Sequence, residues 1–257
     1  IKALTRFPPE KALPILEKLS TDHDSDVRFT TTQALASFPA EKALPLLEKL
    51  SNDPHRQVRC AVANSLASFP AEKALPLLEK LSSDSHRQVR CAVAELLANF
   101  PTEKALQILE NLSNDVYYEI RQAVAESLAS FTPEKALPIL EKLSIDPIDD
   151  VRFAVAQLLA SFPPEVALPL LEKLSTNRNE NVRKTAHHTL LCSFLPKLLQ
   201  DAIAKEDART IFDLLSKFPV VASCIKFEYD LNPTPFLRKL LSIASITRQK
   251  ADLDVSM

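Results

Sequence analysis

Hydrophobic positions recur along this chain with a fixed period of 31 residues. A phenylalanine marks the period at Phe7, Phe38, Phe69, Phe100, Phe131 and Phe162. An aliphatic residue followed by arginine recurs in the same phase, from Val27-Arg28 to Val182-Arg183. Self-similarity with a fixed period of this size is typical of solenoids and other repeat arrays. The pattern therefore predicts six consecutive repeats over residues 7–192, preceded by a partial repeat over residues 1–6.

Each repeat has the pattern of two amphipathic helices. In the second repeat, residues 41–50 place alanine and leucine at helical spacing, with charged residues between them. A second apolar stripe covers residues 56–68 and ends at Phe69-Pro70, because the residue before proline avoids the helical region. A helix pair this short cannot bury both of its faces, whereas stacked pairs share a continuous core. We therefore expect an all-α fold, an α-solenoid of stacked antiparallel helix pairs.

An acidic and a basic column run through the repeats. An aspartate lies six residues before the arginine in five repeats, and Asn177 takes that place in the sixth. The columns are Asp22, Asp53, Asp84, Asp115 and Asp146, and Arg28, Arg59, Arg90, Arg121, Arg152 and Arg183. This spacing, with an aliphatic residue before the arginine and alanines after it, resembles the HEAT repeat. The 31-residue length is similar to the short bacterial HEAT-like repeats of phycobilin lyases.

The resemblance implies a right-handed superhelix and a structural ladder, in which each aspartate accepts hydrogen bonds from an arginine of its own or the neighbouring repeat. A guanidinium fork fits a carboxylate, so the two columns are chemically suited to each other. The alternative, an anion-binding arginine stripe, is disfavoured because the aspartate column would cancel its field.

The composition excludes several function classes. The chain has no glycine, which excludes every phosphate-binding site built on a glycine-rich loop. Thirty-one Lys and Arg balance 33 Asp and Glu, so we expect no nucleic acid and no membrane surface as partner. No apolar run is long enough to span a bilayer. Four cysteines are too few for a disulfide framework, which predicts a reducing, cytoplasmic location.

The positions that vary between repeats are the candidate recognition surface. Three variable columns share one face of the second helices, and the HEAT resemblance implies that this face is concave. A protein or peptide partner suits its acidic, amide and aromatic side chains. The predicted partner-binding residues are Phe29, Gln33, Asn64, Glu95, Gln122, Glu126, Asp150, Phe153, Gln157 and His188. Phe29 and Phe153 are either exposed anchors of this surface or side chains packed between neighbouring repeats.

The sequence gives no support for catalysis. His188 and Cys192 are four residues apart and share a helix face, but no further metal ligands are evident, so we expect no metal and no cofactor. No Ser/His/Asp or Cys/His arrangement stands out. We therefore expect a non-catalytic interaction scaffold that is monomeric by itself. The alternatives are a lyase-like or chaperone-like protein acting on a cofactor-bearing partner, or a sensor or regulatory segment of a larger signalling protein.

The two ends of the chain depart from the repeat pattern. Because the chain begins at Ile1 within a repeat, we expect it to be a fragment of a longer protein. The 31-residue phase is lost after Leu191, and residues 193–247 are expected to form a helical C-terminal cap that can alternatively dock a partner. The polar tail over residues 248–257 is expected to be disordered.

Overall fold

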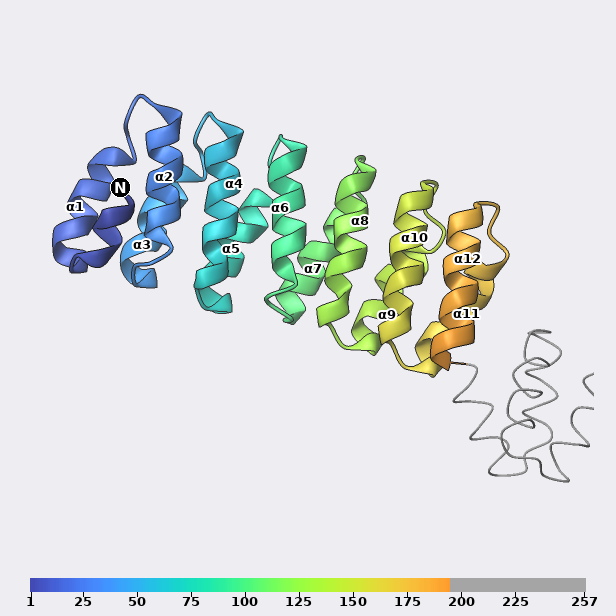
Figure 1. Ribbon diagram of the computed structural model, residues 1–257. Helices are drawn as coiled ribbons and strands as arrows, with labels where there is room; N and C mark the ends of the chain where they lie inside the picture. The colour runs from blue at the N-terminus through green and yellow to red at the C-terminus, as the bar shows by residue number, and fades with distance from the viewer. Residues whose placement is uncertain (195–257) are drawn as a thin grey trace, which may run out of the picture. The chain divides into compact units, whose positions relative to one another are not determined.

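The computed structural model describes residues 1–194, which are helical throughout apart from the turns (Figure 1). These residues contain no β-strand, as the repeat pattern predicts for an all-α solenoid. The chain divides into two compact units, Ile1–Val166 and Ala167–Met257. The sequence placed the end of the solenoid at residue 192, and most of the predicted cap and the whole predicted tail lie outside the described residues.

Five complete helix pairs make up the first unit. The first helices of the pairs are α1 (Pro9–Leu19), α3 (Ala40–Leu50), α5 (Ala71–Leu81), α7 (Glu103–Leu112) and α9 (Pro133–Leu143). The second helices are α2 (Ser25–Leu35), α4 (Arg56–Ser65), α6 (Arg87–Leu97), α8 (Tyr118–Ser127) and α10 (Asp149–Leu158). Short 3₁₀ segments cover Lys2–Arg6, Leu66–Ser68, Leu128–Ser130 and Leu159–Ser161.

The sixth pair lies at the boundary of the units. Helix α11 (Pro164–Ser175) begins at the end of the first unit and continues into the second. Helix α12 (Glu180–Thr189) is followed by a π-helical turn over Leu190–Phe194. The chain therefore keeps the helix-pair pattern through residue 189, and no helix within residues 1–194 is long and apolar enough to cross a bilayer.

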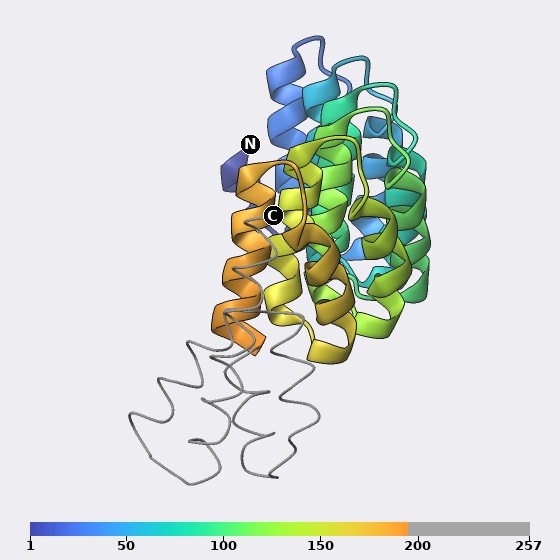
Figure 2. The same cartoon turned by 90° about the vertical axis from the view of Figure 1, so that its right-hand side faces the viewer.

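The helices of the first unit form two layers. Second helices lie beside second helices and first helices beside first helices, and Figure 2 shows the two layers side by side. Neighbouring second helices contact one another more extensively than neighbouring first helices do. The layer of second helices is therefore the tighter of the two.

The core runs between the layers because each repeat supplies the same buried side chains. In the second repeat these include Ala43, Leu47, Val58 and Val62, all with no solvent exposure. The periodic phenylalanines are buried from the second repeat onward: Phe38, Phe69, Phe100, Phe131 and Phe162. The apolar surface that one helix pair leaves exposed is covered by the next pair. This is the physical reason that the repeat period specifies the fold.

The helices end without glycine. At the end of α3, the Ser51 hydroxyl donates to the Glu48 carbonyl oxygen over 2.6 Å and satisfies one of the last free carbonyls. At the end of the second helix, Phe69 adopts an extended conformation (φ −111°, ψ 155°), and Pro70 then precedes the first residue of α5. The Phe-Pro pair thus ends one helix and positions the start of the next.

A proline lies inside five of the six first helices. Pro76 is the sixth residue of α5 and is exposed, whereas α7 has Gln107 at the equivalent position. Proline in a helix interior removes an N–H that would donate to the carbonyl four residues earlier, here that of Glu72. Helix α7 shows that the fold forms without this proline.

We predict that Pro76→Gln stabilises the chain by about 1–3 kcal/mol, because it restores the missing helix hydrogen bond. Thermal melts followed by circular dichroism measure the effect. The control is Pro70→Gln, which changes a proline ahead of α5 where no helix hydrogen bond is missing, and no gain is expected there. An unchanged or lower Tm for Pro76→Gln would show that α5 accommodates its proline without loss.

Candidate interaction surface

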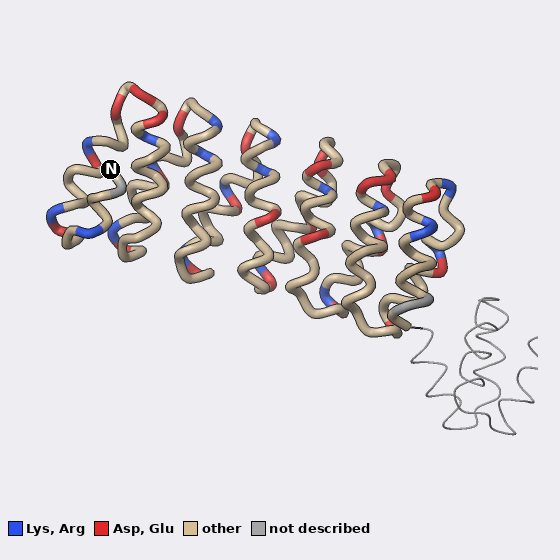
Figure 3. The backbone as a smooth tube through the Cα atoms, viewed as in Figure 1, with Lys and Arg blue, Asp and Glu red and all other residues tan. Residues whose placement is uncertain are grey.

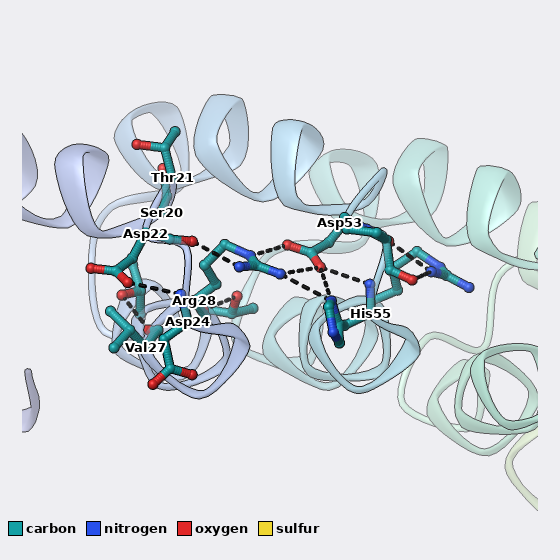
Figure 4. A network of polar contacts seen from close by, with 12 residues as sticks. Ser20, Thr21, Asp22, Asp24, Val27, Arg28, Asp53 and His55 are labelled. Carbon is teal, nitrogen blue, oxygen red and sulfur yellow. Dashed lines mark hydrogen bonds and ion pairs between the residues drawn. The ribbon is translucent and has the colours of Figure 1, made fainter.

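Each arginine of the basic column joins its own turn to the turn of the next repeat. The Nε and Nη2 atoms of Arg59 donate to the Asp84 carboxylate over 2.6 and 2.9 Å. Its Nη1 atom donates to the backbone carbonyl of Asp53 over 2.7 Å. One guanidinium thus holds an acceptor in its own repeat and a carboxylate 25 residues further along the chain. Figure 4 shows the corresponding contacts of Arg28 with Asp22, Asp53 and His55.

The same arrangement occurs four times in the first unit. The pairs are Arg28–Asp53, Arg59–Asp84, Arg90–Asp115 and Arg121–Asp146, each with an Nε···O distance of 2.6 Å. All eight side chains are mostly buried; Arg59, the most exposed of them, is 13% accessible. A bidentate, desolvated ion pair of this kind fixes geometry more strongly than a surface ion pair.

The aspartates also shape the turns between the helices of a pair. The Asp84 carboxylate accepts from the backbone N–H of His86 over 2.7 Å, which folds the turn locally. Burial by itself raises the pKa of this carboxyl, but the hydrogen bonds from Arg59 and His86 and the charge of Arg59 outweigh it, so the pKa is lowered. The same balance lowers the pKa of Asp53 and Asp115.

At both ends of the aspartate and arginine columns, the contacts differ from those of the four middle pairs. The Asp22 carboxylate accepts from the backbone N–H of Asp24 and lies 3.1 Å from His23. Arg152 contacts the Asp146 carbonyl and the Asp149 carboxylate, and its buried Nε has no hydrogen-bond partner among the described residues. In sequence, Asn177 replaces the aspartate that would follow Arg152 by 25 residues. In the second unit, Arg183 donates to the Asn177 carbonyl over 2.9 Å.

The variable columns of the second helices differ in exposure. Gln33, Asn64, Glu95, Glu126, Asp150, Gln157 and, in the second unit, His188 are exposed. Gln122 is partly buried and donates to Glu126 over 2.9 Å. Phe29 and Phe153 are also partly buried, between the two alternatives that the sequence left open.

The profile of HEAT repeats matches residues 1–56, 45–129 and 111–191 of the chain. The chain belongs to the HEAT-repeat family. Among solved structures, Escherichia coli YibA is similar to it with a TM-score of 0.55 and 17% identity, over 95% of this chain and 93% of YibA. The HEAT-repeat fold is typical of protein-interaction scaffolds.

Two further solved structures have lower TM-scores. The complex of CpcE and CpcF of phycocyanin lyase from Nostoc sp. PCC7120 is 18% identical, with a TM-score of 0.48, over 94% of this chain and 98% of the other. Computationally designed armadillo repeat proteins for modular peptide recognition are 22% identical, with a TM-score of 0.45, over 70% and 98% of the two chains. No curated protein matches the chain.

The acidic side chains on the exposed face of the second helices are only partly paired with basic side chains. Glu119 pairs with Arg87 over 3.0 Å, across neighbouring repeats. In the described part of the chain, Glu95, Glu126 and Asp150 form no ion pair with lysine or arginine. Helices α8 and α10 each carry two acidic residues and one arginine, so acidic residues are in surplus there (Figure 3).

No reactive group stands out on this face. The thiol of Cys91 is partly buried and lies 3.5 Å from Glu95, and burial followed by the nearby carboxylates raises its pKa to about 12. It therefore stays protonated and a poor nucleophile at neutral pH. Within residues 1–194, no group of three or more His, Cys, Asp or Glu side chains is placed to hold a metal ion.

Sequence reasoning missed a set of exposed hydrophobic side chains in two neighbouring turns. They are Val116, Tyr117 and Tyr118 in the fourth repeat, and Ile145 and Ile148 in the fifth. The signal was present in the sequence, because the corresponding residues 52–56 of the second repeat are polar apart from Pro54, and residues 83–87 of the third repeat are all polar. Val116 and Ile145 lie outside the helix columns that vary between repeats, in turns for which only the aspartates were singled out.

We predict that Arg90→Ala destabilises the chain by about 1–3 kcal/mol, because the Asp115 carboxylate and the Asp84 carbonyl lose their buried donor. Urea unfolding followed by circular dichroism measures the change. Arg87→Ala is the matched control, since it removes an exposed ion pair with Glu119 and is expected to cost less than about 1 kcal/mol. An equal loss in the free energy of unfolding for the two substitutions would show that the buried Arg90 pair stabilises the chain no more than an exposed pair does.

We predict that stability falls in acid. The lowered pKa values of Asp53, Asp84 and Asp115 mean that the folded chain binds fewer protons than the unfolded chain near pH 4. Their contribution is fully present above the unfolded pKa of about 3.9 and is lost as the pH falls through the folded values. Urea unfolding between pH 7 and pH 3 tests this. We expect the Asp84→Asn variant to have a lower free energy of unfolding at pH 7 and a smaller loss of it in acid. An unaltered pH dependence in Asp84→Asn would contradict the assignment.

Proposed function

We propose that this HEAT-repeat chain is a non-catalytic scaffold that binds a protein or peptide on the exposed face of its second helices, the face that the HEAT resemblance implies to be concave. The observation that carries the proposal is the contrast between a constant framework and a variable face. The core and the Arg–Asp pairs recur from repeat to repeat, whereas the exposed positions of α2, α4, α6, α8 and α10 differ.

The close packing of the second helices supports the choice of this layer. Because neighbouring second helices contact each other extensively, their exposed side chains form a continuous surface across repeats. Some of these side chains contact each other across repeats: Arg56 Nε donates to Gln88 Oε1 over 2.8 Å, and Arg87 pairs with Glu119 over 3.0 Å. A partner segment lying across the helices would therefore meet several repeats at once.

The first-helix layer offers a less distinctive surface. Shallow grooves of about 350 and 250 Å³ lie between α1 and α3 and between α3 and α5. They are lined by the proline, leucine, glutamate and lysine residues that nearly every first helix repeats, including Pro45 and Pro76. A surface that repeats itself in this way gives a partner little to distinguish one repeat from another.

We predict that replacing Glu95, Glu126 and Asp150 with lysine lowers partner retention by about tenfold or more, since exposed charges on an interface set partner choice. Affinity capture with chemical cross-linking and mass spectrometry compares this variant with the intact chain, after circular dichroism shows that both fold. The control carries the same charge change on exposed positions of the first helices: Glu48→Lys, Glu110→Lys and Glu141→Lys.

Retention that survives in the control and is lost in the second-helix variant supports the proposed face. Unchanged retention in both variants, or equal loss in both, contradicts it. A second variant with Phe29→Gln and Phe153→Gln, which introduces the residue that the fourth repeat has at that position, tests the two phenylalanines without adding charge.

A further inference from the structure

Exposed hydrophobic side chains are concentrated at one place in the described chain. Of the seven large hydrophobic side chains that are exposed there, four lie in the turns that precede α8 and α10, and a fifth, Tyr118, is the first residue of α8. We call these five residues the turn patch: Val116, Tyr117, Tyr118, Ile145 and Ile148. Val116 is 83% exposed and Ile145 is 62% exposed, whereas Tyr117, Tyr118 and Ile148 are 42%, 37% and 37% exposed.

The two turns of the patch are joined by one guanidinium. Arg121 donates through Nη1 to the Val116 carbonyl over 3.3 Å, and through Nε to the Asp146 carboxylate over 2.6 Å. Asp146 follows Ile145 directly and accepts from the backbone N–H of Ile148 over 2.9 Å. The two turns that carry the patch are therefore held next to each other, at the ends of α8 and α10 that lie uppermost in Figure 1.

The repeat fold does not require hydrophobic residues at these positions. In the third repeat, Ser83, Ser85 and Arg87 occupy the places of Ile145, Val116 and Tyr118. The Arg–Asp contacts of that turn have the same geometry. Tyr117 has a structural role, because its ring lies 5.4 and 5.7 Å below the guanidinium groups of Arg87 and Arg90. Within residues 1–194, no guanidinium is stacked on the ring of Tyr118, and Val116 and Ile145 are largely exposed. Exposed apolar side chains gathered in one place are a mark of an interaction site.

The surroundings of the turn patch define the charge of its partner. Glu119 on α8 and Asp149 and Asp150 on α10 lie in the first turns of these helices, next to the turn patch, and Glu126 lies near the other end of α8. Two arginines, Arg87 and Arg152, oppose these four carboxylates. On the side of the first helices, Lys142 is bound to Ser113 and Asn114. The carboxylates are in surplus beside the apolar surface, as the red segments of α8 and α10 in Figure 3 show.

We propose that the turn patch and the adjoining carboxylates of α8 and α10 dock an amphipathic segment of a partner protein, with aliphatic or aromatic anchors flanked by lysine or arginine. The anchors pack on Val116, Tyr118, Ile145 and Ile148, and the basic residues meet Glu126 and Asp150. Because Arg121 holds both turns in place before binding, the free-energy cost of ordering this surface on binding is small. The inference rests on the proposed scaffold function and assigns it a location and a partner chemistry.

The test is selection from a displayed library of random peptides of about 16 residues, a length that spans several helical turns. The full chain is the target. Three variants are then compared by fluorescence anisotropy with the selected peptides. The patch variant carries Val116→Ser, Tyr118→Ser and Ile145→Ser, each a residue that another repeat has at that position. The charge variant carries Glu126→Gln and Asp150→Asn. The control variant, Phe7→Ser and Ile15→Ser, removes exposed hydrophobic side chains from the first repeat.

The proposal expects enriched peptides that combine hydrophobic residues with lysine or arginine. Their Kd should rise by about tenfold or more in the patch variant and change by less than about twofold in the control variant. In the charge variant the affinity should fall and lose most of its dependence on salt. Circular dichroism of each variant establishes that the fold is intact.

Other outcomes overturn the proposal. They are the absence of enriched peptides, enrichment of acidic peptides, or peptides that bind the patch variant as tightly as the intact chain. A dimer in light scattering that dissociates in the patch variant would assign the surface to a second copy of the chain. Some peptides could keep their affinity for the patch variant and lose it for the variant with Phe29→Gln and Phe153→Gln. That result would support the proposed scaffold function and contradict only the location at the turn patch.

Discussion

The structure depends on one guanidinium that bonds to two turns at once. In each of four repeats, an arginine donates backward to the carbonyl of its own turn and forward to the aspartate of the next. Hydrophobic packing between the layers is non-directional and tolerates sliding, whereas a bidentate ion pair permits only one register. Removing either member leaves a desolvated charge behind, so the two columns are retained together. This pairing also replaces glycine in the turns, since the aspartate side chain folds the turn that a glycine often permits.

Most of the fold was predictable from the sequence because the repeat states the same pattern six times. The expected helix over residues 41–50 corresponds to Ala40–Leu50, and the stripe over residues 56–68 corresponds to Arg56–Ser65 with a 3₁₀ turn over Leu66–Ser68. The direction of each arginine's contact was not predictable. An aspartate six residues before an arginine is compatible with a contact within the repeat, and only the stacking of turns brings Arg59 closer to Asp84 than to the Asp53 side chain. Likewise, no sequence signal indicated the π-helical turn over Leu190–Phe194.

The candidate site was less predictable than the fold, for a related physical reason. Spacing places side chains on a helix face, so Glu95 and Glu126 lie exposed on the second helices as the columns implied. Spacing does not report how far a neighbouring helix covers that face, and Phe29 and Phe153 are partly buried. In the turns, periodicity gives no face at all. The exposure of Val116 and Ile145 was indicated only by comparison between repeats, because Ser85 and Ser83 occupy their places in the third repeat.

The interchangeability of the first helices has a consequence for how such a protein changes length. Helices α3 and α5 have the same eleven residues, and each middle repeat presents an arginine to its successor and an aspartate to its predecessor. A genetic crossover between misaligned copies would therefore insert or delete a 31-residue cassette whose two ends already match their new neighbours. Such an event creates no foreign interface, yet it displaces every distal turn and helix face by one step. The array can thereby acquire a new order of surface residues in a single recombination, without a point mutation in its core.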